Sequence, residues 1–258
     1  NKTYIMGILN VTPDSFSDGG KFNNIDAALK HTEQMIKDGA DIIDVGGEST
    51  RPNYTKISDE EEIGRVTPVI EAIKKNFDIP VSIDTYKSAV GEAAIKSGAD
   101  LMNDIWGFKY DEKMAEITAK YNKTCCLMHN RKEAVYNNFI EDVLADLKES
   151  VDIALKAGVK KEYIMLDPGV GFAKSYEQNL EITNKLEMLN TLGYPVLLGT
   201  SRKSMIGLTL DLPADQRVEG TLATTVLAVI KNAMFVRVHD VLENKRIIKM
   251  TERILGKA

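Results

Sequence analysis

Short apolar runs recur along the chain, and each run ends in a polar residue that is followed by a loop. Runs of this length are typical of buried parallel strands, whose carboxyl ends lie on one face of a sheet. Eight such runs, each with a polar end, predict an α/β fold, a (β/α)8 or TIM barrel with its active site on that face. The polar residues are Asn10, Asp44, Asp84, Asn103, His129, Asp167, Ser201 and His239.

Segments with helical periodicity lie between the apolar runs, for example residues 25–36, which Gly39 closes at the C-cap position. Two junctions resemble each other, residues 39–44 and residues 98–104, and each leads from a helix end into a strand. The alternation predicts repeated βαβ units and a parallel sheet. An open doubly wound sheet has the same alternation, but eight units favour closure into a barrel. Further helical segments are residues 89–98, 140–158 and 218–232.

Two long connections, residues 11–24 and residues 46–59, are poor in helical signals and rich in Gly, Ser, Thr, Pro and Asp. They predict long loops after the first and second strands, lying over the catalytic face. The length of 258 residues suits one barrel domain over residues 1–258.

Composition narrows the class of protein. The chain is 43% hydrophobic and 28% charged, and it has no apolar stretch long enough for a membrane span. No signal peptide is visible, and the net charge of −5 should repel nucleic acid. The only cysteines, Cys125 and Cys126, are neighbours in one apolar run, so their side chains should point to opposite faces of a strand. Buried free thiols of this kind indicate the cytoplasm.

Four strand ends supply two carboxylates and two amides, from Asn10, Asp84, Asn103 and Asp167. Such groups recognise a ring with several adjacent N–H donors and a carbonyl, such as a purine or a pterin. The alternative is that each residue is a turn or N-cap residue, which suits Asp84 before Thr85 and Asp167 before Pro168. Paired carboxylates are only a weak metal signal here, because no HxH or HExxH spacing occurs among the three histidines.

Basic residues follow three strands of this acidic chain: Arg51, Arg202 with Lys203, and Arg237 with His239. They predict a phosphate or pyrophosphate site, since arginine suits bidentate binding of oxyanions. A helix that begins near Ser204 could add backbone N–H donors. The alternative is that these cations form structural ion pairs with acidic neighbours such as Glu48 and Asp240.

Two features of the loops have weaker signals. Gly169 and Gly171 lack the full GxGxxG pattern, so a tight strand-to-helix turn explains them as well as a phosphate loop does. Phe16, Met128 and Phe172 could form apolar walls for a flat ring, although each could equally be ordinary packing.

Seven strings between Asn10 and Asp240 resemble dihydropteroate synthases and occur in the order of that family. The strings are NVTPDSFSDGG, DVGGESTRP, SIDTYK, MNDIWG, LDPGVGFAK, GTSRKS and RVHD. The resemblance implies condensation of 6-hydroxymethyl-7,8-dihydropterin pyrophosphate with p-aminobenzoate, giving dihydropteroate and pyrophosphate by dissociative substitution. Two positions depart from the usual family pattern: Asn53 replaces a glycine, and Asn130–Arg131 replaces Met-Gln.

The resemblance also implies roles for individual residues. Asp84, Asn103, Asp167 and Lys203 would bind the pterin, with Met128 and Phe172 beside it. The pyrophosphate would contact Asn10, Arg51, Arg237 and His239, with Mg2+ on Asn10. The p-aminobenzoate pocket would contain Phe16, Thr50, Pro52 and Ser204, and Phe172 would border it. The catalytic residues would be Asp18, Arg51, Lys203, Arg237 and His239.

By the same resemblance the protein would be a sulfonamide target and a homodimer formed through the late helices. Two other functions stay open. A methyltetrahydrofolate-dependent methyltransferase domain shares the strand-end Asp and Asn residues but has no need for pyrophosphate-binding cations. A non-catalytic barrel that binds a pterin or phosphate ligand is the other alternative.

Overall fold

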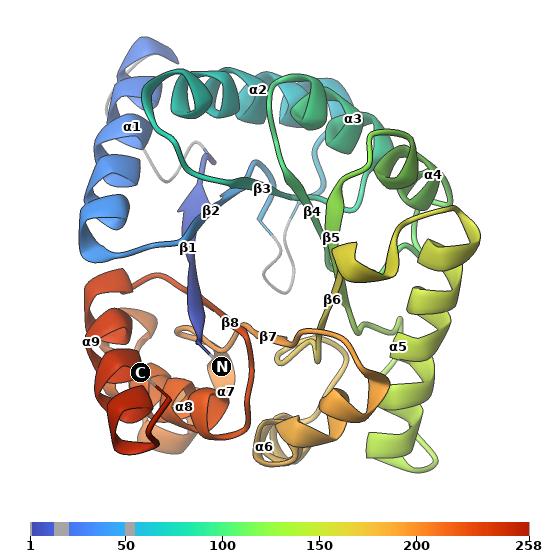
Figure 1. The fold of residues 1–258 in the computed structure, drawn as a ribbon, viewed down its shortest axis with the longest axis vertical. Coiled ribbons are helices and arrows are strands. Elements are labelled where there is room, and N and C mark those ends of the chain that lie inside the picture. The colour runs from blue at the N-terminus through green and yellow to red at the C-terminus, as the bar shows by residue number, and fades with distance from the viewer. Residues whose placement is uncertain (1, 13–20, 50–54, 258) are drawn as a thin grey trace.

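The computed structural model describes residues 2–12, 21–49 and 55–257, and its strands form a parallel barrel surrounded by helices (Figure 1). The sheet order is β6-β5-β4-β3-β2-β1-β8-β7, and a bridge between Leu166 and Val196 links its two outer strands. The predicted TIM barrel is therefore confirmed. The strands are β1 (Tyr4–Asn10), β2 (Ile42–Gly46), β3 (Val81–Asp84), β4 (Leu101–Asp104), β5 (Thr124–Met128), β6 (Ile164–Asp167), β7 (Leu197–Leu198) and β8 (Phe235–Val238).

Helices follow the strands around the outside of the barrel (Figure 1). They are α1 (Lys21–Asp38), α2 (Asp59–Asn76), α3 (Ser88–Lys96), α4 (Lys113–Lys120), α5 (Phe139–Lys156), α6 (Tyr176–Asn184), α7 (Ser204–Leu210), α8 (Val218–Ile230) and α9 (Val241–Ile254), with short 3-10 helices η2 (Lys161–Tyr163), η3 (Leu186–Leu192) and η4 (Ala214–Gln216). None of the helices in the described ranges combines the length and the apolarity that a bilayer crossing needs.

The two similar helix-to-strand junctions are built in the same way. Gly39 and Gly98 have φ values of +102° and +114°, a left-handed conformation that glycine adopts without a steric cost. Two residues later, Asp41 and Asp100 each accept a hydrogen bond from a backbone N–H at the start of a neighbouring strand, at 2.9 Å in β1 and 3.0 Å in β3. The repeated sequence thus fixes where two strands enter the barrel.

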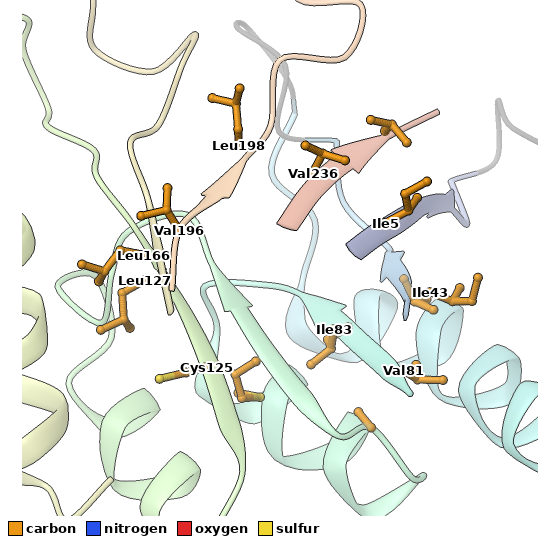
Figure 2. Packing of buried hydrophobic residues seen from close by; sticks show 14 of the residues in the cluster. Ile5, Ile43, Val81, Ile83, Cys125, Leu127, Leu166, Val196, Leu198 and Val236 are labelled. Atoms are coloured by element: carbon orange, nitrogen blue, oxygen red, sulfur yellow. The ribbon is translucent and has the colours of Figure 1, made fainter. Parts of the chain in front are cut away.

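Side chains alternate between the two faces of the strands, as the period of two requires. Figure 2 shows outward-facing residues, among them Ile43, Ile83, Cys125 and Val236, that pack in the large hydrophobic core. Cys126 belongs to a separate cluster, so the predicted opposite orientation of the two buried, free cysteines is confirmed. This second cluster fills the barrel interior with Met6, Ile42, Leu101, Cys126, Met165, Leu197 and Phe235.

Candidate functional site

A layer of polar side chains lies directly above the apolar interior of the barrel. Asp44, Asn103, Asp167 and Arg237 each follow a member of the interior cluster by two residues, so their side chains point to the same face of the sheet. Asp84 ends β3, and it pairs in register with Asn103 of β4. The layer therefore joins side chains from β2, β3, β4, β6 and β8.

Arg237 is the centre of this layer. Its Nε donates to Asp44 Oδ2 at 2.6 Å, and its Nη2 donates to Asp84 Oδ2 at 2.7 Å. Asn103 Nδ2 donates to the same oxygen of Asp44 at 3.2 Å. The second oxygens of Asp44 and Asp84 are buried and have no hydrogen-bond partner among the described residues. One guanidinium thus neutralises two carboxylates only in part, and two acceptors remain for a ligand with N–H donors.

Burial controls the charge of these groups. It raises the pKa of Asp84 to about 7, an effect that Arg237 opposes and Asp44 increases. Burial also raises the pKa of Asp167, although the neighbouring Lys203 ammonium favours its ionised form. Both carboxylates would be stabilised in the ionised form by N–H donors from a bound ring.

Asp167 uses one carboxylate oxygen in a turn and directs the other toward Gly199. Its Oδ1 accepts a hydrogen bond from the N–H of Gly169 at 2.7 Å, which is a turn interaction. Its Oδ2 faces Gly199, where an added Cβ would lie 3.6 Å from that oxygen and 4.0 Å from Lys203 Nζ. The absence of a side chain at Gly199 leaves the space between these two charged groups open.

Lys203 lies where the loop after β6 meets the loop after β7. Its Nζ donates to the carbonyl of Val170 and lies 4.9 Å from the centre of the Phe172 ring. Burial lowers the pKa of Lys203 to about 8, and Asp167 opposes this change. The predicted proximity of Asp167, Lys203 and Phe172 is therefore present.

An apolar cluster borders the polar layer. Met128 and Phe172, which we expected to form walls for a flat ring, belong to it together with Tyr86, Ile105 and Trp106. The last three residues were not predicted, because nothing in their local sequence distinguishes them from ordinary core residues.

Asn10 and His239 lie at the ends of β1 and β8. Gly46 separates Asn10 from Asp84, since a Cβ there would be 3.6 Å from Asn10 Oδ1 and 3.7 Å from Asp84 Oδ2. His239 Nδ1 is 2.9 Å from Ser201 Oγ, and the backbone N–H of His239 donates to the same hydroxyl at 3.1 Å. Both side chains are accessible at the mouth of the barrel.

Arg202, like Arg237, forms an ion pair with acidic neighbours, as the structural alternative expected. Its guanidinium forms two hydrogen bonds to Asp240, at 2.5 and 3.1 Å, and so serves as a local ion pair. Glu48 pairs instead with Lys87 at 2.7 Å. Ser204 begins α7, as predicted, and its side chain is exposed. Phe16, Asp18, Thr50, Arg51, Pro52 and Asn53 lie outside the described residues.

Sequence reasoning overlooked Asp44 as a site residue, although it noted that a strand run ends there. Asp44 is fully buried in the middle of β2, two residues before the strand ends, and Gly46 occupies the end position. Its spacing of two residues after Ile42 is the same as that of Asn103 after Leu101, and this spacing could have identified it.

Residues 6–239 match the family model described as pterin binding enzyme. A dihydropteroate synthase of Clostridium beijerinckii is 67% identical over 255 residues, covering 98% of this chain and 95% of its own. A dihydropteroate synthase of Bacillus subtilis is 56% identical over 256 residues, covering 99% of this chain and 90% of its own.

Solved structures agree with these sequence relatives. A Clostridium difficile dihydropteroate synthase, solved in the presence of pteroic acid, has a TM-score of 0.96 and 52% identity, covering 98% of this chain and 97% of its own. A Xanthomonas albilineans enzyme with 4-aminobenzoic acid has a TM-score of 0.94 and 38% identity, covering 99% and 94%. The chain belongs to the pterin-binding enzyme family and, within it, to the dihydropteroate synthases.

Proposed function

We propose that the chain condenses 6-hydroxymethyl-7,8-dihydropterin pyrophosphate with p-aminobenzoate, releasing dihydropteroate and pyrophosphate. The observation that carries the proposal is the buried layer in which Arg237 joins Asp44 and Asp84 beside Asn103, Asp167 and Lys203. Family membership favours this reaction over a methyltransferase or a non-catalytic barrel. Release of pyrophosphate from the pterin substrate in the presence of p-aminobenzoate and Mg2+ tests the proposal.

The pterin would be held by its polar edge and its flat faces. Asp84 and Asp167 accept hydrogen bonds from ring N–H groups, while Asn103 and Lys203 contact ring acceptors. Met128 and Phe172, from the apolar cluster, would lie against the ring. Support comes from the buried Asp84 Oδ1, which accepts no hydrogen bond from the described residues, and from the open space beside Asp167 Oδ2.

The pyrophosphate would lie at the barrel mouth between Asn10, Arg237 and His239, with Arg51 as a fourth contact. Asn10 offers an amide oxygen of the kind that Mg2+ prefers. No group of three or more His, Cys, Asp or Glu residues in the described ranges is arranged to hold a metal, which suits an ion bound mainly by substrate oxygens. When bound, Mg2+ would neutralise charge on the leaving group.

Chemistry would follow a dissociative course. Arg237, Lys203 and His239 stabilise the charge that develops on the departing pyrophosphate, and the pterin ring stabilises the electron-deficient methylene. The arylamine nitrogen then bonds to this carbon and releases one proton to solvent, so no strong general base is needed. We place p-aminobenzoate near Ser204 and Phe172, with Phe16, Thr50 and Pro52 around it, and Asp18 beside the transient cation. Sulfonamides, as p-aminobenzoate analogues, would compete at this pocket.

Asp167→Asn should retain the fold and weaken pterin binding by about tenfold to a hundredfold, because a charge-assisted hydrogen bond contributes about 1.5–3 kcal/mol. An amide oxygen can still accept from Gly169, but the amide NH2 then replaces Oδ2 and cannot accept a hydrogen bond from a ring N–H. Calorimetry with 6-hydroxymethylpterin measures the change, and thermal unfolding checks the fold. An unchanged pterin affinity would remove Asp167 from the site.

We place this chain in the cytoplasm, because buried free thiols at Cys125 and Cys126 suit a reducing compartment.

We also propose a homodimer formed through α8 and α9. These helices carry the exposed apolar side chains of Ile230, Met250 and Ile254, which are 48%, 59% and 71% accessible. Light scattering should give the mass of two chains, and Ile254→Glu should give one. A monomeric wild-type protein would contradict the dimer.

A further inference from the structure

Lys174 lies in the loop between β6 and α6, and its ammonium makes three short contacts inside the protein. Its Nζ donates to the carbonyl of Gly169 at 2.9 Å and to the carbonyl of Phe172 at 3.0 Å. The third contact, at 2.8 Å, is with His129 Nδ1 at the end of β5. An ammonium has three N–H donors, so these contacts use all of them. Burial lowers the pKa of Lys174 to about 7, and Asp167 opposes this change, so the ammonium with its three donors predominates below that pH.

His129 is arranged to accept the hydrogen bond from Lys174. Its Nε2 is 2.9 Å from Asp146 Oδ2, and Arg131 Nε donates to the same carboxylate oxygen at 2.6 Å. Burial lowers the pKa of His129 to about 4, so the ring is neutral at neutral pH. These contacts assign the ring proton to Nε2 and leave Nδ1 as the acceptor. The imidazole therefore connects the β6–α6 loop to β5 and α5.

The loop that Lys174 binds carries contacts to three groups of the pterin site. The N–H of Gly169 holds Asp167, and the carbonyl of Val170 accepts from Lys203. Phe172 presents its ring to the same lysine. A displacement of residues 169–172 would consequently move an acceptor, a cation and an apolar wall of the site together.

We propose that Lys174 is a positioning residue for pterin recognition: it ties the carbonyls of Gly169 and Phe172 to His129 and so fixes the loop that orients Asp167, Phe172 and Lys203. The inference rests on the proposed function, because it concerns the same pterin site. Lys174 acts through the loop, and none of its three donors is available to a substrate.

Lys174→Met tests this role, because methionine keeps the length of the side chain and loses all three donors. Calorimetry with 6-hydroxymethylpterin gives the dissociation constant of the folded molecules, and the stoichiometry reports the folded fraction. We expect the pterin dissociation constant to rise at least about tenfold, as for the loss of a charged hydrogen-bond donor. The KM for p-aminobenzoate should rise less than the pterin dissociation constant, because Phe172 lies on this loop but Ser204, which also borders the p-aminobenzoate pocket, begins α7. A purely structural role would lower the stoichiometry and leave the dissociation constant unchanged.

Two further variants complete the experiment. Lys185→Met removes an exposed lysine of the same region, paired with Glu181 at 2.7 Å, and should bind the pterin as the wild type does. Lys174→Arg keeps the charge, but its planar donors cannot reach all three acceptors, so its affinity should lie between those of the wild type and the Met variant. If Lys174→Met does not fold, the Arg variant supplies the measurement.

Wild-type affinity in any folded variant that lacks the Lys174 ammonium would overturn the inference. The proposed function fails separately, if the wild-type protein neither binds 6-hydroxymethylpterin nor releases pyrophosphate from the pterin substrate.

Discussion

Arg237→Met should abolish turnover and lower the free energy of unfolding by about 3–5 kcal/mol, the cost of breaking a buried ion pair by removing one partner. The change leaves Asp44 and Asp84 close together without the guanidinium that contacts both at 2.6 and 2.7 Å. Denaturant unfolding measures the stability, and pyrophosphate release measures the turnover. Arg202→Met is the matched control, because Arg202 pairs with Asp240 at a partly exposed site and should cost about 1 kcal/mol or less.

The stability deficit of Arg237→Met should depend on pH in a defined direction. When folding raises the pKa of a carboxyl, the folded state binds more protons than the unfolded state. The free energy of unfolding therefore falls as the pH rises from the ordinary pKa of 3.8 to the pKa in the folded state. For Asp84 this pH range ends at about 7 in the wild type. Loss of Arg237 extends the range to higher pH, because Arg237 lowers the pKa of Asp84. The deficit should therefore be larger at pH 8 than at pH 5. An equal deficit at both values, or active enzyme, would contradict the role of Arg237.

Gly169→Ala should lower the free energy of unfolding by at least about 2 kcal/mol and weaken pterin binding by at least about tenfold. The alanine would have to adopt a left-handed backbone conformation, and its Cβ would clash with a neighbouring carbonyl. Gly169 has φ +70°, and an added Cβ would lie 1.9 Å from the backbone carbonyl oxygen of His129. The loop must move to relieve this contact, which breaks the hydrogen bond to Asp167 and displaces Lys174.

Gly193→Ala is the control for the backbone effect alone. Gly193 has a similar φ of +78°, but apart from its chain neighbours no atom of the described residues lies within 4 Å of its added Cβ. It should cost about 1 kcal/mol and leave pterin binding unchanged. Equal effects of the two alanines on stability and on binding would show that close packing against His129 is unimportant.

The strand-end pattern predicted the barrel because each strand carries its own signal. A polar residue at a fixed spacing after an apolar run can be recognised from the local sequence alone. Asp84, Asn103 and Asp167 are recognised in this way. The glycine caps at Gly39 and Gly98 are equally local, since their positive φ depends on the helix end alone.

Other parts of the site depend on contacts that a local pattern cannot report. Arg202 follows β7 and Arg237 lies in the neighbouring β8, yet Arg202 pairs with Asp240 and Arg237 pairs with Asp44 and Asp84. Lys174 has no local sequence signal for its contact with His129, because that partner is 45 residues away. Partner choice is set by tertiary packing, so these roles emerged only from the structure.

Pyrophosphate release is the measurement that tests the central proposal most directly. The wild-type protein is mixed with 6-hydroxymethyl-7,8-dihydropterin pyrophosphate, p-aminobenzoate and Mg2+, and pyrophosphate and dihydropteroate are both quantified. We predict equal amounts of the two products, dependence on all three additions, and loss of both products in Arg237→Met. Absence of pyrophosphate release, or release without formation of dihydropteroate, would contradict the proposal.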